Sequence, residues 1–266
     1  MPSMKVLTTL FLNCLFLLHV TSLYAAESTN QSNSSTTKPL PSREQLIASN
    51  YPDEQVIWLN ADTQQGLLIH HPNTFEKNYG KILVVSDSGS TTKTPGFNKK
   101  ISQDLPSLGW NVYHLYQPQT DQLDNSSISN QVDFKVQMNQ ALNIVLQSSN
   151  YKTYILVKND AITAFFSLID SQPTTIDGVI IVASQSMDFS SEKNLNNLIK
   201  LTVPIYVYTP SNTSDQTKSW LINLKKRSKQ PFTHYKIPNH YLIDSDAAFF
   251  ANRIHGWLKT QTQSSQ

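Results

Sequence analysis

The chain of 266 residues has one cysteine, seven glycines and a net charge of only +2, and each of these small values argues against a class of protein. The cysteine, Cys14, lies in an apolar stretch near the N-terminus, so the rest of the chain has neither a disulfide framework nor a thiolate nucleophile. The first strand-to-helix turn lacks the G-x-G-x-x-G fingerprint of a dinucleotide site, and so few glycines leave little room for one elsewhere. A net charge of +2 is too small to indicate a nucleic-acid partner.

Residues 1–26 have the layout of a secretory signal peptide. Lys5 precedes an apolar run over residues 6–20, and Ala25 and Ala26 are the small residues at which such a peptide is cleaved. At about 15 residues the run is shorter than the roughly 20 that a bilayer-spanning helix needs. We therefore predict signal cleavage rather than an uncleaved anchor, and an exported protein that is most simply periplasmic, with secretion as the alternative.

Composition divides the remaining chain into three parts. Residues 27–50 open on a stretch rich in Ser, Thr and Asn that cannot bury enough apolar surface to offset its ordering entropy, and we assign them to a disordered spacer. Residues 51–260 suit one domain with a sizeable core, and residues 261–266 read as a flexible tail. The basic cluster at residues 225–229 is most simply a solvated helix end, not a polyanion site.

Hydrophobic patterning predicts strands that alternate with helices. Short apolar runs at residues 55–59 and 66–70 flank a polar turn and predict an antiparallel hairpin. Residues 81–85 are continuously apolar, as in a parallel strand covered on both faces. Further strands are predicted over residues 110–116, 154–157, 178–183, 203–208 and 233–237. Helical spacing predicts helices around residues 97–108, 134–148, 161–169, 195–199, 220–224 and 247–259.

This order of elements predicts an α/β fold. Alternating strands and helices imply right-handed crossovers and a mostly parallel sheet with helices on both faces. The leading hairpin adds antiparallel strands at one edge of the sheet. Together these features favour an α/β-hydrolase-type sheet over a Rossmann sheet.

Five segments resemble a bacterial family of exported, α/β-hydrolase-like proteins that is described only as a domain of unknown function. They are EQVIWL (54–59), GKILVVSDSG (80–89), LGWNVYHLYQP (108–118), DGVIIVAS (177–184) and RIHGWLK (253–259). The GW pair before a strand and the terminal GWLK are the most specific of these pieces. The resemblance covers nearly all of the predicted domain; it implies a periplasmic α/β-hydrolase fold and supplies no reaction.

The stretch YILVKNDAITAFFSLI, residues 154–169, predicts a buried strand, a tight turn and a helix, which is where an α/β hydrolase carries its nucleophile. In place of G-x-S-x-G the chain reads K-N-D-A-I, which puts Asp160 at the nucleophile position. A carboxylate can form an ester intermediate, but bulky Lys158 and Ile162 stand where small residues are needed. The pattern therefore favours Asn159 or Asp160 as the cap of the following helix.

The sequence also offers candidates for the histidine, the acid and the oxyanion hole of a hydrolase site. His240 follows the last strand, and Asp215 follows the strand before it, where a hydrolase has its histidine and its acid. Ser88 and Gly89 lie in the loop that would form the oxyanion hole. Ser86 and Ser88 are possible displaced nucleophiles, although no sequence feature puts a base beside them. For each residue a structural interpretation, as a solvated loop or turn residue, is the simpler one.

The remaining histidines lack metal-ligand spacing such as H-E-x-x-H, so we expect neither a metal nor a cofactor. Three functional hypotheses stay open. The first is an exported α/β-hydrolase-fold protein that has lost the catalytic elbow and acts by binding or assembly in the envelope, with an envelope protein or a small molecule as partner and no stable membrane span after cleavage. The second is an esterase-like hydrolase that uses Asp160 or a displaced serine with His240 and Asp215. The third is a surface-tethered scaffold or adhesion domain, with the spacer providing reach.

Overall fold

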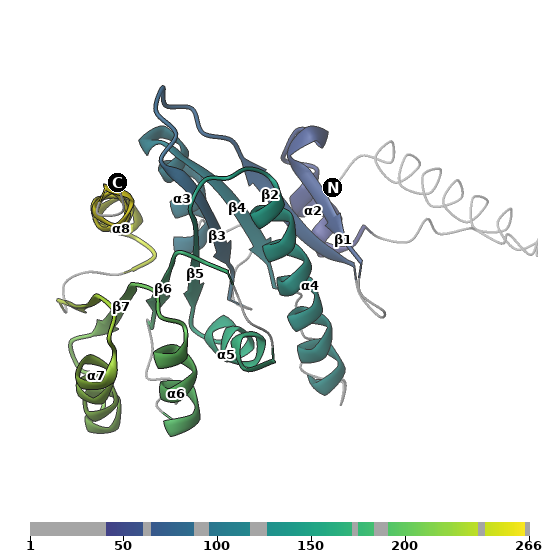
Figure 1. Ribbon diagram of the computed structural model, residues 1–266. Helices are drawn as coiled ribbons and strands as arrows, with labels where there is room; N and C mark the ends of the chain where they lie inside the picture. The colour runs from purple at the N-terminus through teal and green to yellow at the C-terminus, as the bar shows by residue number, and fades with distance from the viewer. Residues whose placement is uncertain are drawn as a thin grey trace, which may run out of the picture. The chain divides into compact units, whose positions relative to one another are not determined.

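An eight-stranded sheet forms the centre of the computed structural model, which describes residues 41–60, 65–87, 96–117, 127–171, 175–183, 191–238 and 243–263 (Figure 1). Its strands are β1 (Val56–Leu59), β2 (Gly66–His71), β3 (Gly80–Val85), β4 (Trp110–Tyr116), β5 (Thr153–Lys158), β6 (Gly178–Val182), β7 (Ile205–Pro210) and β8 (Phe232–Ile237). Their order across the sheet is β1-β2-β4-β3-β5-β6-β7-β8. Strand β2 pairs antiparallel with β1 and β4, and all other pairs are parallel. The predicted α/β-hydrolase-type sheet with its N-terminal hairpin is confirmed.

Helices cover both faces of this sheet. They are α2 (Arg43–Ala48), α3 (Phe97–Asp104), α4 (Ser127–Gln147), α5 (Ala161–Ser171), α6 (Glu192–Lys200), α7 (Asp215–Arg227) and α8 (Ala247–Gln263), with 3-10 turns η1 (Asp53–Gln55) and η2 (Leu105–Leu108). Helices α4, α5, α6 and α7 contribute to the core on one face, and α3 and α8 to the core on the other. No helix in the described part of the chain is long and apolar enough to cross a bilayer.

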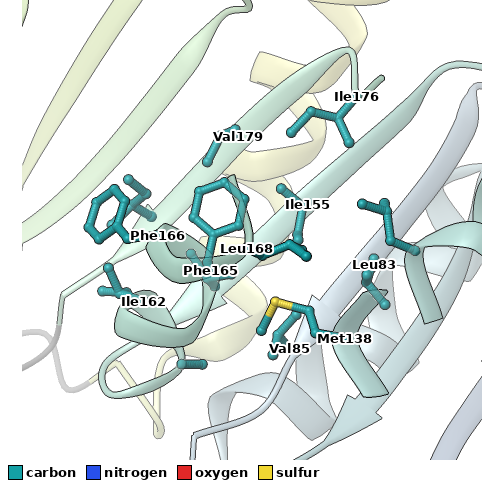
Figure 2. Packing of buried hydrophobic residues seen from close by; sticks show 14 of the residues in the cluster. Leu83, Val85, Met138, Ile155, Ile162, Phe165, Phe166, Leu168, Ile176 and Val179 are labelled. Atoms are coloured by element: carbon teal, nitrogen blue, oxygen red, sulfur yellow. The ribbon is translucent and has the colours of Figure 1, made fainter. Parts of the chain in front are cut away.

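The central strands are buried on both faces because their side chains alternate between two apolar cores. In β3, Leu83 and Val85 belong to one core, while Ile82 and Val84 belong to the other. All six residues of β3 are buried, which confirms the prediction of a strand covered on both sides. Figure 2 shows the first core, where Met138, Ile162, Phe165, Phe166 and Leu168 of the helices pack on Leu83, Val85, Ile155 and Val179 of the strands.

The ordered part of the protein extends beyond both predicted boundaries of the domain. Residues 43–48, assigned above to the disordered spacer, form helix α2, whose first turn is held by a reciprocal capping box between Ser42 and Gln45. Ile47 of this helix is only 3% exposed, so α2 belongs to the core. At the other end α8 continues to Gln263, into the segment predicted to be a flexible tail. Residues 41–266 form one compact unit, while the predicted signal peptide lies outside the described residues.

A buried lysine fixes the end of α4 against the sheet. Lys81 of β3 is 1% exposed, and its Nζ donates to the carbonyl oxygens of Val145 and Ser149, both at 2.7 Å. The last carbonyl groups of a helix have no backbone partner within the helix, and this ammonium, together with Ser148 Oγ on the carbonyl of Val145, provides donors to them. Burial lowers the pKa of Lys81, and the charge of Asp177 acts in the opposite direction.

Candidate functional site

The turn between β5 and α5 has its apex at Asn159. This residue has a φ of 50°, the left-handed region, and its N–H donates to the carbonyl oxygen of Val182 at the end of β6. Its own carbonyl accepts from the N–H of Ile162 in the first turn of α5. Asparagine tolerates this backbone region better than most residues. A strained turn between strand and helix is where an α/β hydrolase holds its nucleophile, so Asn159 occupies that position.

The sequence placed Asp160 at the nucleophile position, whereas the left-handed residue of this turn is Asn159, one residue earlier. Asp160 directly precedes α5, and its carbonyl accepts from the N–H of Thr163, so the predicted start of the helix is confirmed. The positions two before and two after the apex hold Val157 and Ala161, not Lys158 and Ile162. Ala161 is small, as the turn requires, so Lys158 and Ile162 do not crowd the positions that flank this apex. The side chain at the apex is an amide, whose nitrogen lone pair is delocalised and is a poor nucleophile.

A cluster of charged and polar groups surrounds this apex, and we call Lys158, Asp87, Asp244 and Asn159 the elbow cluster. Lys158 Nζ lies 3.1 Å from Asp87 Oδ2 and 3.1 Å from Asp244 Oδ1, and its side chain is only 6% exposed. Asn159 Nδ2 donates to Asp87 Oδ2 at 2.9 Å. The N–H of Phe97, at the start of α3, donates to Asp244 Oδ1 at 2.9 Å. The cluster thus joins the ends of β3 and β5 to α3 and to the segment before α8.

These contacts orient the side chain of Asp87 and hold it in place. An ammonium and an amide N–H both stabilise a carboxylate, and charge-assisted hydrogen bonds of this kind are stronger than neutral ones. The side chain of Asp87 is 12% exposed, whereas that of Asp244 is 59% exposed. The buried half of the cluster is therefore the pair of Lys158 and Asp87, with Asp244 closing it from the solvent side. Such an arrangement orders the turn and presents an amide at its apex.

Of the residues predicted as the histidine, the acid and the oxyanion hole, the structure describes only Asp215, which lies outside the elbow cluster. Asp215 lies in the first turn of α7, with a side chain that is 95% exposed and a carboxylate 2.6 Å from Lys218 Nζ. That hydrogen bond lowers the pKa of Asp215, and the role of Asp215 as the acid beside His240 stays a prediction. His240, Ser88 and Gly89 lie outside the described residues. Within the described ranges, no three His, Cys, Asp or Glu side chains are grouped as metal ligands would be.

Sequence reasoning missed a second pair of groups, Ser86 and His114. Ser86 Oγ lies 2.5 Å from His114 Nε2, and both residues are buried. The signal was the strand pairing, because Val84 is opposite His114 and the side chains of Ser86 and His114 then share a face of the sheet. Burial holds the pKa of His114 well below its usual value of 6.5, so the imidazole is neutral. The N–H of Ser86 still donates to the carbonyl oxygen of Leu115, so Ser86 continues the ladder of the sheet.

Comparison with solved structures identifies the class of fold. Similar structures include an esterase domain from a Rhodothermus marinus protein, with 9% identity over 77% of this chain and 97% of that chain and a TM-score of 0.58. A dienelactone hydrolase from Anabaena variabilis has 10% identity, covers 76% of this chain and 94% of its own, and has a TM-score of 0.57. A sugar hydrolase from Lactococcus lactis has 10% identity, with 79% and 100% covered and a TM-score of 0.55. The protein therefore has the α/β-hydrolase fold. Sequence identities this low show the fold alone and do not indicate an activity.

Within that class, residues 7–133 match the model of a family described as "Protein of unknown function (DUF3530)". The matched range includes the hairpin, β3 and β4, and so three of the five segments named above. No curated protein matches the chain. The resemblance inferred from the sequence, to α/β-hydrolase-like proteins described as a domain of unknown function, is confirmed.

Proposed function

We propose that this α/β-hydrolase-fold protein is exported to the bacterial envelope and acts there by binding or assembly, without hydrolysis at the β5 turn. The observation that carries this proposal is the identity and environment of Asn159. Its amide lies at the turn apex where a hydrolase needs a nucleophile, and it donates a hydrogen bond to Asp87. Asp87 is in turn bound to Lys158, so the groups nearest the apex are engaged with one another.

The contact between Ser86 and His114 favours a second candidate, an esterase-like hydrolase with a displaced serine. In that reaction Ser86 Oγ would attack the carbonyl carbon of an ester while His114 Nε2 takes its proton and passes it to the departing alkoxide. Water would then hydrolyse the acyl-serine. The neutral state of His114 suits the role of base. Against it stand the complete burial of Ser86 and its place in the sheet ladder, which keep the hydroxyl away from an ester.

An esterase assay tests both candidates together. The full chain is incubated with p-nitrophenyl acetate and p-nitrophenyl butyrate, alongside Ser86→Ala, Asp160→Asn and His240→Ala. We expect hydrolysis at the background rate of the buffer for the wild-type chain and every variant. Turnover by the wild-type chain that disappears in one variant of unchanged thermal stability would overturn the proposal, and the variant concerned would identify the group responsible.

Export is tested separately, by fractionation and N-terminal sequencing of the protein from expressing cells. Cleavage after Ala25 or Ala26 would give a chain that begins at Ala26 or Glu27 in the periplasmic fraction. A chain that keeps residues 1–26 and stays in the cytoplasmic fraction would contradict the envelope assignment. That result would leave the assay of the elbow unaffected.

A further inference from the structure

Helix α7 presents a solvent-facing surface that combines lysines with an exposed isoleucine. Its inward side consists of Thr217, Trp220, Leu221 and Leu224, all buried, at the spacing of one helical face. On the outward side Ile222 is 53% exposed. Lys218 and Lys226 lie four residues from Ile222 and Lys225 lies three residues from it, so the helix gathers these side chains around the isoleucine. We call Lys218, Ile222, Lys225 and Lys226 the basic face of α7.

The charges of this part of the chain are strongly one-sided. Residues 211–238, which form α7 and the edge strand β8, contain six lysines and arginines and one carboxylate, although the whole chain has a net charge of only +2. Asp215 pairs with Lys218, and Arg227 pairs with Glu192 of α6. Lys225 and Lys226 form no ion pair with any carboxylate among the described residues.

The position of α7 leaves this face open. The helix lies beside α6 at the β8 end of the sheet, the far end from the hairpin of β1 and β2 (Figure 1). The charged run of residues 225–229 was interpreted above as a solvated helix end, and its lysines are indeed exposed. The structure adds an exposed isoleucine in the middle of them. A single exposed isoleucine is ordinary at a protein surface, but this one lies within four residues of three exposed lysines, a combination that suits a partner both apolar and anionic.

We propose that the basic face of α7 is a docking surface for an anionic lipid bilayer. The lysines would lie against the negatively charged headgroups, each strengthening binding about fivefold, while Ile222 enters the boundary with the acyl chains. Long lysine side chains suit this geometry because their stems cover apolar surface while their ammonium groups reach the headgroups. The inference goes beyond the proposed function, since it does not depend on the elbow cluster, and it gives the binding activity a surface and a partner.

Sedimentation with vesicles of defined composition tests the proposal. The full chain is mixed with large vesicles of phosphatidylglycerol and phosphatidylcholine in equal parts, and with vesicles of phosphatidylcholine alone. The variants are Lys225→Gln/Lys226→Gln and Ile222→Asn, and the matched control is Lys100→Gln/Lys135→Gln, which removes the same charge from α3 and α4. All variants retain the apolar run of residues 6–20, so differences between them isolate α7.

We expect the wild-type chain to bind the anionic vesicles more tightly, and to release them at about 0.5 M NaCl, where the screening length falls below about 5 Å. Lys225→Gln/Lys226→Gln should weaken binding about 25-fold and Ile222→Asn about tenfold, with less than about a twofold change in the control pair. If both double lysine variants lost the same amount of vesicle affinity, the binding would depend on net charge alone and the proposal would be overturned. It would also be overturned if Ile222→Asn had no effect and dextran sulfate bound the chain as tightly as the vesicles did, because the site would then take soluble polyanions.

Discussion

Lys158 Nζ and Asp87 Oδ2 are 3.1 Å apart at the point where an α/β hydrolase builds its catalytic elbow. Lys158 is the last residue of β5, and the next residue, Asn159, forms the apex of the turn. In an α/β hydrolase the space around this apex serves the substrate and the catalytic histidine. Here a cation and a carboxylate meet there, so the same place in the fold holds a structural contact.

We predict that Lys158→Met destabilises the protein by about 3 kcal/mol, because it leaves Asp87 buried without its cation. Asp87→Asn in the same background should restore part of that loss, since the double variant leaves only the exposed Asp244 without its cation. The measurement is a double-mutant cycle of unfolding free energies in urea. A single Lys158→Met variant as stable as the wild type would show that the pair does not order the turn.

A second prediction concerns Lys81 and the end of α4. Lys81→Met should cost about 2 to 3 kcal/mol of unfolding free energy, because the carbonyl groups of Val145 and Ser149 lose a charged donor. Lys135→Met, on the same helix and away from this contact, should change stability by less than about 0.5 kcal/mol. The two variants are compared by urea unfolding. Similar costs for both would mean that the helix end finds other partners.

The two GW pairs of the sequence allow a third prediction with its own control. Gly109 has a φ of +98°, and a Cβ there would lie 2.5 Å from Tyr79 Cδ2 and 2.6 Å from the carbonyl oxygen of Lys77. Gly256 lies inside α8 with nothing within 4 Å of such a Cβ. Gly109→Ala should therefore cost about 2 kcal/mol or more, while Gly256→Ala should gain about 0.5 to 1 kcal/mol. Thermal unfolding distinguishes them, and a shift of the same sign in both would contradict the argument.

Much of the fold could be predicted from hydrophobic period alone, because buried strands and amphipathic helices leave strong patterns. All eight predicted strands exist, and Gly109 ends the 3-10 turn η2 with a left-handed backbone, as expected of a terminal glycine. Helix α2 was not predicted, because its six residues are too few to show a helical period of apolar residues and it follows a polar stretch. Its capping box, S-x-x-Q at Ser42 and Gln45, was the available signal.

The site was harder to predict because its register depends on contacts distant in sequence. A lysine is seldom buried, so β5 was expected to end at Val157 and the apex was expected one residue late. The structure buries Lys158 as the last residue of the strand because Asp87 and Asp244 receive its charge. Neither partner is near Lys158 in the chain, and pattern reading along the sequence gives no indication of either.

The buried histidines beneath α2 predict that the protein loses stability in mild acid. Burial, with a smaller effect from His70, lowers the pKa of His71 to about 4. Burial also lowers the pKa of His114 well below 6.5, and the charges of His71, Lys99 and Arg43 act in the same direction. In the unfolded chain both imidazoles would titrate near 6.5. The unfolded state therefore binds more protons than the native state over this interval, and the stabilisation present above pH 6.5 is lost as the pH falls toward 4.

The expected slope is about 1.4 kcal/mol per pH unit for each of the two histidines, within that interval. Unfolding free energies in urea, measured in steps from about pH 7.5 to pH 5, give the slope directly. His71→Gln/His114→Gln should flatten it, because glutamine does not titrate and still offers a hydrogen-bonding group beside Ser86. His234→Gln on the edge strand β8 is the control; burial lowers the pKa of His234 too, but this side chain is far more exposed and should contribute less. An unchanged slope in the double variant would contradict the prediction. It would mean that groups other than His71 and His114 cause the loss of stability in acid.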